Sequence, residues 1–152
     1  MRPIKNSLWF DGNAEEAARF YCAVFPDADI TGVQRYTEAG PGEPGSVVTV
    51  TWRIGPVEFV GINGGPQHTF SPAISFVAEC EDQTELDRLW DALLADGGTP
   101  SMCGWLEDRF GISWQVIPHE LPALIEHPDA AAAMLRMVRI DLAELRRAAG
   151  VA

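Results

Sequence analysis

The sequence predicts an α+β fold in which a βαβββ module occurs twice and is followed by a short helical tail. A capped amphipathic helix is expected at residues 13–25 and again at residues 82–96, each time after an extended segment. Each helix is followed by strand-like runs, and the last strand of each half begins at a glycine, Gly55 or Gly111. A unit that recurs in this way indicates two modules of one architecture.

The first module is expected to begin with a strand over residues 4–10. Asn13 and Glu16 have the spacing of a capping box at the start of the helix. The apolar face of the helix follows a period of 3.6 residues and comprises Ala14, Ala17, Ala18, Tyr21 and Phe25. Strands are then expected over residues 28–36, 46–54 and 55–62, and the Gly- and Pro-rich residues 37–45 are typical of a mobile loop.

The second module repeats this order in a shorter form. A strand is expected over residues 73–80, and a helix begins at the capping pair Asp82 and Glu85 and stops at Gly97. Strand-like residues follow at 99–106 and 111–117, with Asp108 in the hairpin turn between them. The two helix caps lie 69 positions apart but the two closing glycines only 56, so the second module is trimmed in its middle.

The two modules divide the chain into a paired domain over residues 1–118, with module one at 4–63 and module two at 73–118. A tail over residues 119–152 follows, in which helices are expected at 129–138 and 142–149. Asp141 precedes the second of them as an N-cap. The apolar residues of such a tail commonly cover a sheet or join a dimer interface.

Composition excludes several classes of function. The 152 residues suit one domain or two small fused modules, and a net charge of −11 repels nucleic acid and anionic membranes. No apolar run approaches the roughly 20 residues that cross a bilayer, and the first residues do not resemble a secretory signal. Three widely spaced cysteines fit a reducing cytoplasm better than a disulfide framework. We therefore expect a cytoplasmic protein with neither a nucleic-acid nor a membrane partner.

Three stretches resemble a known family. They are Leu8-Trp-Phe-Asp-Gly-Asn-Ala-Glu-Glu-Ala-Ala-Arg-Phe-Tyr21, the middle segment with Asn63-Gly-Gly-Pro66 and residues 73–82, and Cys103-Gly-Trp-Leu-Glu-Asp-Arg-Phe-Gly-Ile-Ser-Trp-Gln-Val-Ile-Pro118. Over about residues 4–118 the chain is similar to the PhnB-like, or 3-demethylubiquinone-9 3-methyltransferase-like, branch of the glyoxalase/bleomycin-resistance (vicinal-oxygen-chelate) superfamily. The resemblance implies paired βαβββ modules whose mixed sheets curl into a cup around a ligand, usually in a homodimer. It does not fix the reaction.

Metal-dependent members of this superfamily draw His, Gln or Glu ligands from the first and last strands of each module. The positions that match here are Asn6, Phe59, Ser75 and Gln115. Only Gln115 is a plausible ligand, whereas a divalent metal needs three or four donors. We therefore expect neither a metal nor another cofactor.

Strand alternation predicts which side chains face the cup. Trp114 and Val116 are expected beneath the helices, which turns Gln115 toward a ligand that its amide could bind as donor and acceptor. A Gln115 that only bonds neighbouring backbone is the alternative. The expected ligand-facing residues are Asn6, Leu8, Phe10, Phe59, His68, Ser75, Val77, Cys103, Trp105, Ser113, Gln115 and Ile117.

Cys103 and Gln115 are the only candidates for a catalytic role. Cys103 would act as a nucleophile only if a cation or a helix end lowered the pKa of its thiol, and a packing or ligand-contact role is the favoured interpretation.

These observations favour a module that binds a small apolar or aromatic ligand. The alternative is a metal-independent enzyme of the superfamily. A methyltransferase activity, as the family label suggests, is disfavoured because no glycine-rich turn for a nucleotide-like cofactor joins a strand to a helix.

Overall fold

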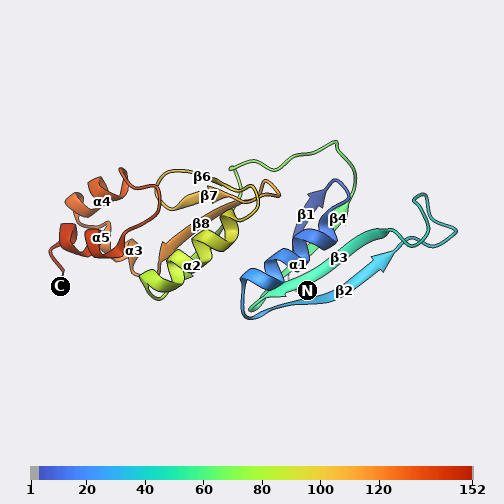
Figure 1. Cartoon of the computed structure of the whole chain (residues 1–152), viewed down its shortest axis with the longest axis horizontal. Coiled ribbons are helices and arrows are strands. Elements are labelled where there is room, and N and C mark those ends of the chain that lie inside the picture. The colour runs from blue at the N-terminus through green and yellow to red at the C-terminus, as the bar shows by residue number, and fades with distance from the viewer. Residues whose placement is uncertain (1–3, 152) are drawn as a thin grey trace. The chain divides into compact units, whose positions relative to one another are not determined.

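The computed structural model of the chain describes residues 4–151, which fall into two compact units divided between Phe70 and Ser71 (Figure 1). Each unit contains one βαβββ module. The first unit ends shortly after its module, whereas the second also includes the helical tail.

The first unit is a four-stranded sheet with one helix. Strand β1 (Asn6–Phe10) leads into helix α1 (Ala14–Val24), and the strands β2 (Ala28–Arg35), β3 (Val47–Ile54) and β4 (Val57–Asn63) follow. The sheet has the order β1-β4-β3-β2, with β1 parallel to β4 and antiparallel pairs elsewhere.

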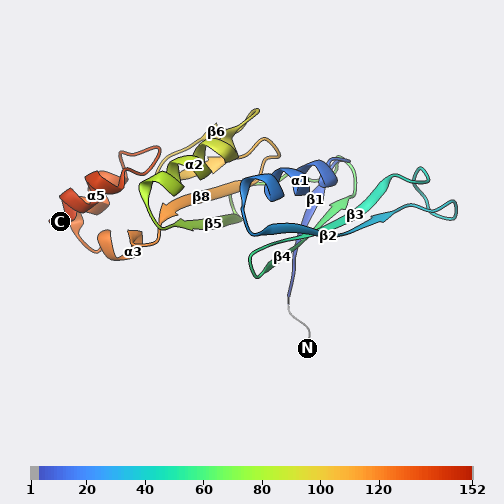
Figure 2. The same ribbon diagram turned by 60° about the horizontal axis from the view of Figure 1, so that its bottom comes forward.

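The second unit repeats this topology. Strand β5 (Ser75–Cys80) precedes helix α2 (Gln83–Leu94), and β6 (Thr99–Pro100), β7 (Trp105–Glu107) and β8 (Ser113–Pro118) follow in a sheet of order β5-β8-β7-β6. Figure 2 shows each helix running across a face of the sheet of its own module. The predicted α+β fold of two βαβββ modules is confirmed, and the short β6 and β7 make the second copy the trimmed one.

Aromatic stacking holds α1 against the first sheet. The ring centroids of Tyr21 and Trp52 lie 5.9 Å apart, and those of Trp52 and Phe59 lie 5.2 Å apart in nearly parallel planes. Gly61 lets the helix come close, because a Cβ at this position would lie 3.1 Å from the Cβ of Ala14. The core of this unit therefore lies between α1 and the strands β3 and β4.

The capping of α1 differs from the expectation. Asn13 makes no side-chain cap; instead the amide N–H of Ala14 donates to Oδ1 of Asn63 (2.9 Å), and Nδ2 of Asn63 donates to the carbonyl of Val47 (3.1 Å). The predicted Asn13–Glu16 capping box is wrong because the end of β4 brings a competing amide to the helix start.

The other two predicted caps are confirmed. The amide N–H of Glu85 donates to Oδ1 of Asp82 (2.8 Å), and the amide N–H of Glu144 donates to Oδ1 of Asp141 (2.9 Å). The carboxylate of Glu85 reaches one residue further back than in a standard capping box and accepts from the amide N–H of Glu81.

Asp108 organises the turn between β7 and β8. Its side chain is only 2% exposed, and Oδ1 accepts from the amides of Phe110 (2.9 Å) and Ile112 (3.1 Å). Oδ2 accepts from the indole N–H of Trp114 (2.9 Å). One carboxylate therefore fixes both the turn and the rotamer of a core tryptophan in the following strand.

The tail forms three short helices, α3 (Leu121–Leu124), α4 (Pro128–Met134) and α5 (Leu142–Ala149). The helix expected over residues 129–138 ends earlier than predicted, because the chain then turns back to the β6–β7 connection. The amides of Cys103 and Gly104 donate there to the carbonyls of Met137 (2.7 Å) and Val138 (2.8 Å). Within the part of the chain that is described, none of the helices has the length and hydropathy needed to cross a membrane.

Candidate functional site

The second sheet has one face against α2 and one open face. The paired residues of β5 and β8 alternate between these faces. On the helix face the pairs are Phe76 with Trp114, Ala78 with Val116 and Cys80 with Pro118. On the open face they are Ser75 with Ser113, Val77 with Gln115 and Glu79 with Ile117. The difference in burial supports this assignment. Trp114 is 4% and Val116 0% exposed, whereas Val77 is 52% exposed.

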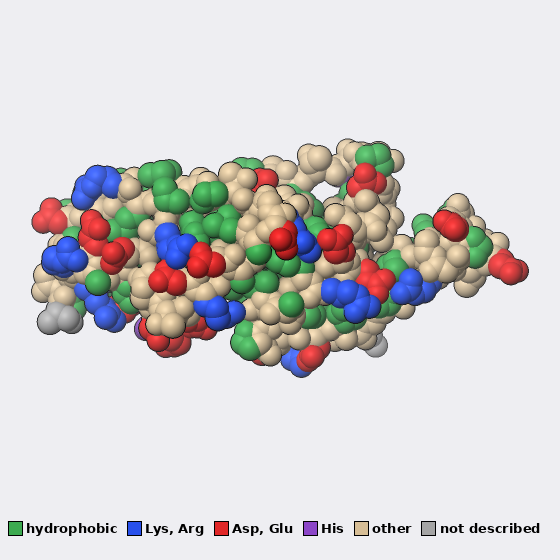
Figure 3. All heavy atoms as spheres, viewed as in Figure 1, with side chains coloured by type: hydrophobic (Ala, Val, Ile, Leu, Met, Phe, Trp, Pro, Cys, Tyr) green, Lys and Arg blue, Asp and Glu red, His purple; other side chains and the backbone are tan. Residues whose placement is uncertain are grey.

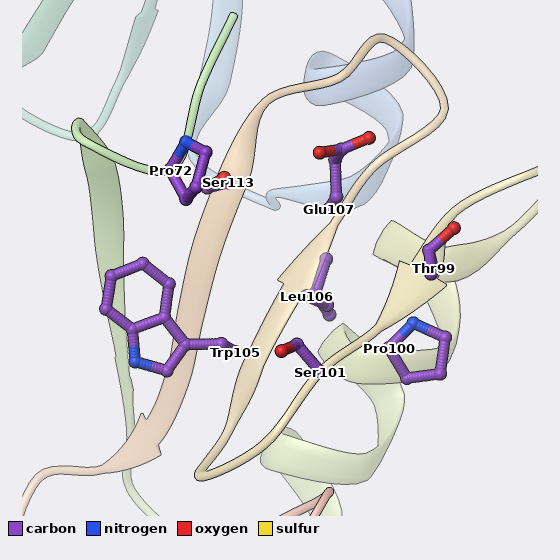
Figure 4. A pocket seen from close by; sticks show the side chains of 8 residues that line it. All are labelled: Pro72, Thr99, Pro100, Ser101, Trp105, Leu106, Glu107 and Ser113. Atoms are coloured by element: carbon purple, nitrogen blue, oxygen red, sulfur yellow. The ribbon is translucent and has the colours of Figure 1, made fainter.

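A pocket of about 290 Å³ lies beside β6 and β7 (Figure 4). Trp105 and Glu107 project from β7, and Ser113 lies on the neighbouring strand β8. The lining residues are Pro72, Thr99, Pro100, Ser101, Trp105, Leu106, Glu107 and Ser113. A largely apolar wall with a few polar groups is typical of small-molecule sites, and this volume is near the lower end of their range.

Gln115 lies next to this pocket rather than in its lining. It pairs in register with Trp105, and its Nε2 donates to Oγ of Ser75 (2.9 Å). The amide is therefore held by a side chain of the open face and not by backbone. Of the residues predicted for the second module, the structure brings Ser75, Val77, Trp105, Ser113, Gln115 and Ile117 to one face of the sheet.

The orientation predicted for the first module is wrong. Asn6 and Phe10 pair with Phe59 and Asn63 on the face toward α1, so Phe10 and Phe59 are core residues, 3% and 4% exposed. Leu8 pairs on the same face with Gly61, where an added Cβ would lie 3.1 Å from the Cβ of Ala14 in the helix.

The expectation for the first strand aligns the two modules by their helix caps, and one additional residue makes this alignment wrong. Three residues, Asp11 to Asn13, connect β1 to α1, whereas only Glu81 and Asp82 connect β5 to α2. Gly12 has φ +85°, a left-handed conformation that glycine accommodates. Counting back from the helix cap therefore shifts the first strand by one residue, which places every side chain on the opposite face.

With the first sheet in its observed register, different residues of the two modules occupy equivalent positions. Phe59 corresponds to Trp114, since both are core aromatics of the last strand, and Val60 corresponds to Gln115. Glu58, the carboxylate beside Phe59, bonds Nζ of Lys5 at 2.5 Å. Sequence reasoning could have found this alignment by matching the buried aromatics, instead of counting from the helix caps for the first strands and from Gly55 and Gly111 for the last strands.

His68 and Cys103 also differ from their expected places. The ring of His68 packs edge-on against Trp9 with centroids 5.0 Å apart, in the first unit. Cys103 was expected to lie in an extended segment with Trp105, but it has φ +60° in a turn, and β7 begins only at Trp105. Cys103 is half-buried and does not line the pocket.

The residues present do not fit the metal site of the metal-dependent superfamily members. Asn6 and Phe59 lie on the helix face of the first sheet, and Val60, which corresponds to Gln115, has no donor atom in its side chain. Ser75 and Gln115 offer one hydroxyl and one amide that already bond each other. Among residues 4–151, no three His, Cys, Asp or Glu side chains form a group suited to a metal ion.

The reactivity of the cysteine thiols is expected to depend on their burial. Burial raises the pKa of the Cys80 thiol to about 11, and the nearby Glu85 carboxylate adds to this effect. At pH 8 only roughly one Cys80 thiol in a thousand would be a thiolate. We expect iodoacetamide to modify Cys103 before Cys80 in the folded protein, as measured by peptide mass spectrometry. Equal rates without denaturant would contradict the burial of Cys80.

Comparison with protein families identifies one match. The family model described as 3-demethylubiquinone-9 3-methyltransferase matches residues 2–117, which include both modules but not the helical tail. A comparison with curated proteins finds no match.

Solved structures show the same architecture. A PhnB protein of Bacillus cereus is 36% identical, with 76% of this chain and 99% of that chain covered and a TM-score of 0.68. A protein of Pseudomonas aeruginosa (19% identity, 78% and 98% covered, TM-score 0.63) and a gene product of Arabidopsis thaliana (18% identity, 78% and 99% covered, TM-score 0.54) share the fold.

Proposed function

The chain belongs to the 3-demethylubiquinone-9 3-methyltransferase family, and we propose that it binds a small apolar or aromatic molecule on the open face of its second sheet. The observation that carries this proposal is the pocket beside Trp105. Its walls combine an indole ring and two prolines with the hydroxyl of Ser113. An apolar ligand that covers Trp105 would remove its surface from water, and polar groups at the pocket edge would orient it.

Gln115 is the proposed polar contact for this ligand. Its Nε2 is bonded to Ser75, whereas its amide oxygen has no hydrogen-bond partner among residues 4–151. This oxygen is available to accept a hydrogen bond from a ligand bound over the neighbouring Trp105. The expected ligand therefore carries an apolar body and at least one hydrogen-bonding group.

Methyl transfer is not part of the proposal. Among residues 4–151, three connections lead from a strand directly into a helix: Asp11-Gly12-Asn13, Glu81-Asp82 and His119-Glu120. None of them is a glycine-rich loop for a nucleotide-like cofactor. The glycine-rich residues 61–65 end β4 and lead to a proline, not to a helix. We expect S-adenosylmethionine to leave the melting temperature unchanged.

A binding experiment tests the proposed site. A calorimetric titration with 1-naphthol should show a single binding event. The affinity should fall at least several-fold in Trp105→Ala, because the apolar wall of the pocket is lost. Gln115→Leu should change the affinity with little change in melting temperature.

The matched control is Gln34→Leu, which removes an exposed amide from the first sheet. This variant should bind 1-naphthol as the unmodified protein does. Equal affinity in all three variants would place the ligand elsewhere and contradict the proposed site.

We also propose that the protein forms a homodimer. The edge strand β5 and the residue before it expose apolar side chains, with Ile74 73% and Val77 52% exposed. An uncovered apolar sheet edge favours association with another chain. Light scattering at micromolar concentration should give twice the 16.6 kDa mass of one chain. A mass of one chain would overturn this proposal.

A further inference from the structure

The pocket on the open face of the second sheet carries a carboxylate beside its aromatic ring, and we infer that it selects a small organic cation. This inference rests on the proposed function and specifies the charge of the ligand. It is based on the side chains of β7 and on the charges that surround them.

Trp105 and Glu107 are two residues apart in β7 and therefore project to the same side of the sheet. Both line the pocket (Figure 4). At the rise of an extended strand their Cα atoms are about 7 Å apart. An ammonium group between them can lie within about 6 Å of the indole centroid and still reach the carboxylate. The geometry therefore allows a cation–π contact and an ion pair with one cationic centre.

Glu107 has no basic partner of its own. Several other carboxylates have a basic partner, among them Glu15 with Arg19, Glu58 with Lys5, and Glu120 with Arg146. Among residues 4–151, no ion pair or side-chain hydrogen bond of Glu107 is formed. The carboxylate thus remains available for a cation from outside the chain.

The remaining lining residues do not compensate this charge. They contribute hydroxyl groups and proline rings but no Lys, Arg or His side chain. The nearest arginine along the chain, Arg109, is bonded to Asp96 at 3.3 Å and lies over the ring of Phe110. Asp and Glu side chains are spread over both units on the face shown in Figure 3, and the net charge of −11 adds a long-range attraction for cations. An anionic ligand would meet repulsion from Glu107 at this site.

The proline rings and the hydroxyls set further requirements. Pro72 and Pro100 form apolar walls, which fit a hydrocarbon group attached to the cationic nitrogen. Ser113 is only 5% exposed and offers a hydroxyl oxygen that can accept from an ammonium N–H. The inferred ligand class is an amine or quaternary ammonium compound with an aromatic or aliphatic body.

Three probes that share one ring separate charge from shape. Calorimetric titrations with benzyltrimethylammonium, benzyl alcohol and benzoate at low salt should rank the cation first, roughly tenfold tighter than the alcohol, and benzoate last. In Glu107→Gln the cation should lose most of this advantage while the affinity for benzyl alcohol stays the same. Trp105→Leu should weaken both probes.

Glu126→Gln is the matched control, since it removes one exposed carboxylate from the same unit away from the pocket. It should keep the full preference for the cation. Equal binding of the three probes, or a preference that Glu107→Gln leaves intact, would overturn the cation inference while the proposed apolar site stands. Failure of all three probes to bind would overturn both.

Discussion

Replacing Trp114 with alanine is expected to lower the free energy of unfolding by about 3–5 kcal/mol, the usual cost of truncating a large aromatic core residue. The side chain is 4% exposed, packs against Phe76 with ring centroids 5.4 Å apart, and donates its indole N–H to Asp108. Urea denaturation followed by circular dichroism measures the change.

Gln115→Leu is the comparison for this variant, because it changes the adjacent residue on the other face of the same strand. It should alter the free energy of unfolding by less than about 1 kcal/mol, since the amide is half-exposed and bonds only Ser75. A loss in Gln115→Leu equal to that in Trp114→Ala would mean that the two faces of β8 are assigned the wrong way round.

Asp108→Ala is expected to cost about 2–4 kcal/mol, because three donors lose their acceptor in a buried turn. Trp114→Phe removes the indole N–H together with part of the ring, so in this background Asp108→Ala no longer leaves the indole donor without its acceptor and should cost less. A double-mutant cycle by urea denaturation should give a coupling of about 1–2 kcal/mol between the two positions. Additive effects would contradict the hydrogen bond that links the turn to the core.

The fold could be predicted from the sequence because local sequence patterns determine its helices, strands and turns. The spacing of apolar residues in α1 and α2, the Asp82 and Asp141 caps, and the glycines Gly55 and Gly111 before the last strands all act within a few residues. The repeat then determined the topology, since a second copy of the same pattern must pair its strands in the same order.

The candidate site was only partly predictable. In the second module the bulky Trp114 and Val116 identified the helix face, so Gln115 and Ser113 were assigned to the open face, as the structure has them. In the first module the alignment by helix caps failed, because the turn at Gly12, which has a left-handed conformation, is one residue longer than its counterpart in the second module. Such a conformation leaves little trace in an apolar pattern.

Interactions between distant segments could not be predicted either. Asn63 replaces Asn13 as the cap of α1 because the end of β4 lies at the helix start, a distance of 49 residues in sequence. Likewise, the return of the tail to Cys103 and Gly104 depends on backbone carbonyls, which carry no residue-specific signal. Glu107 was missed as a pocket residue because an exposed glutamate in a strand resembles any solvated side chain.

The most direct test of a ligand site on the open face of the second sheet is an NMR titration of ¹⁵N-labelled protein with 1-naphthol. The indole N–H of Trp105 and the side-chain amide of Gln115 should shift in proportion to ligand occupancy, whereas the indoles of Trp52 and Trp114 should stay unchanged because both are buried against the helices. Shifts confined to the core residues Phe10 and Phe59, or to the surface around Gln83 and Arg139, would contradict the proposed site.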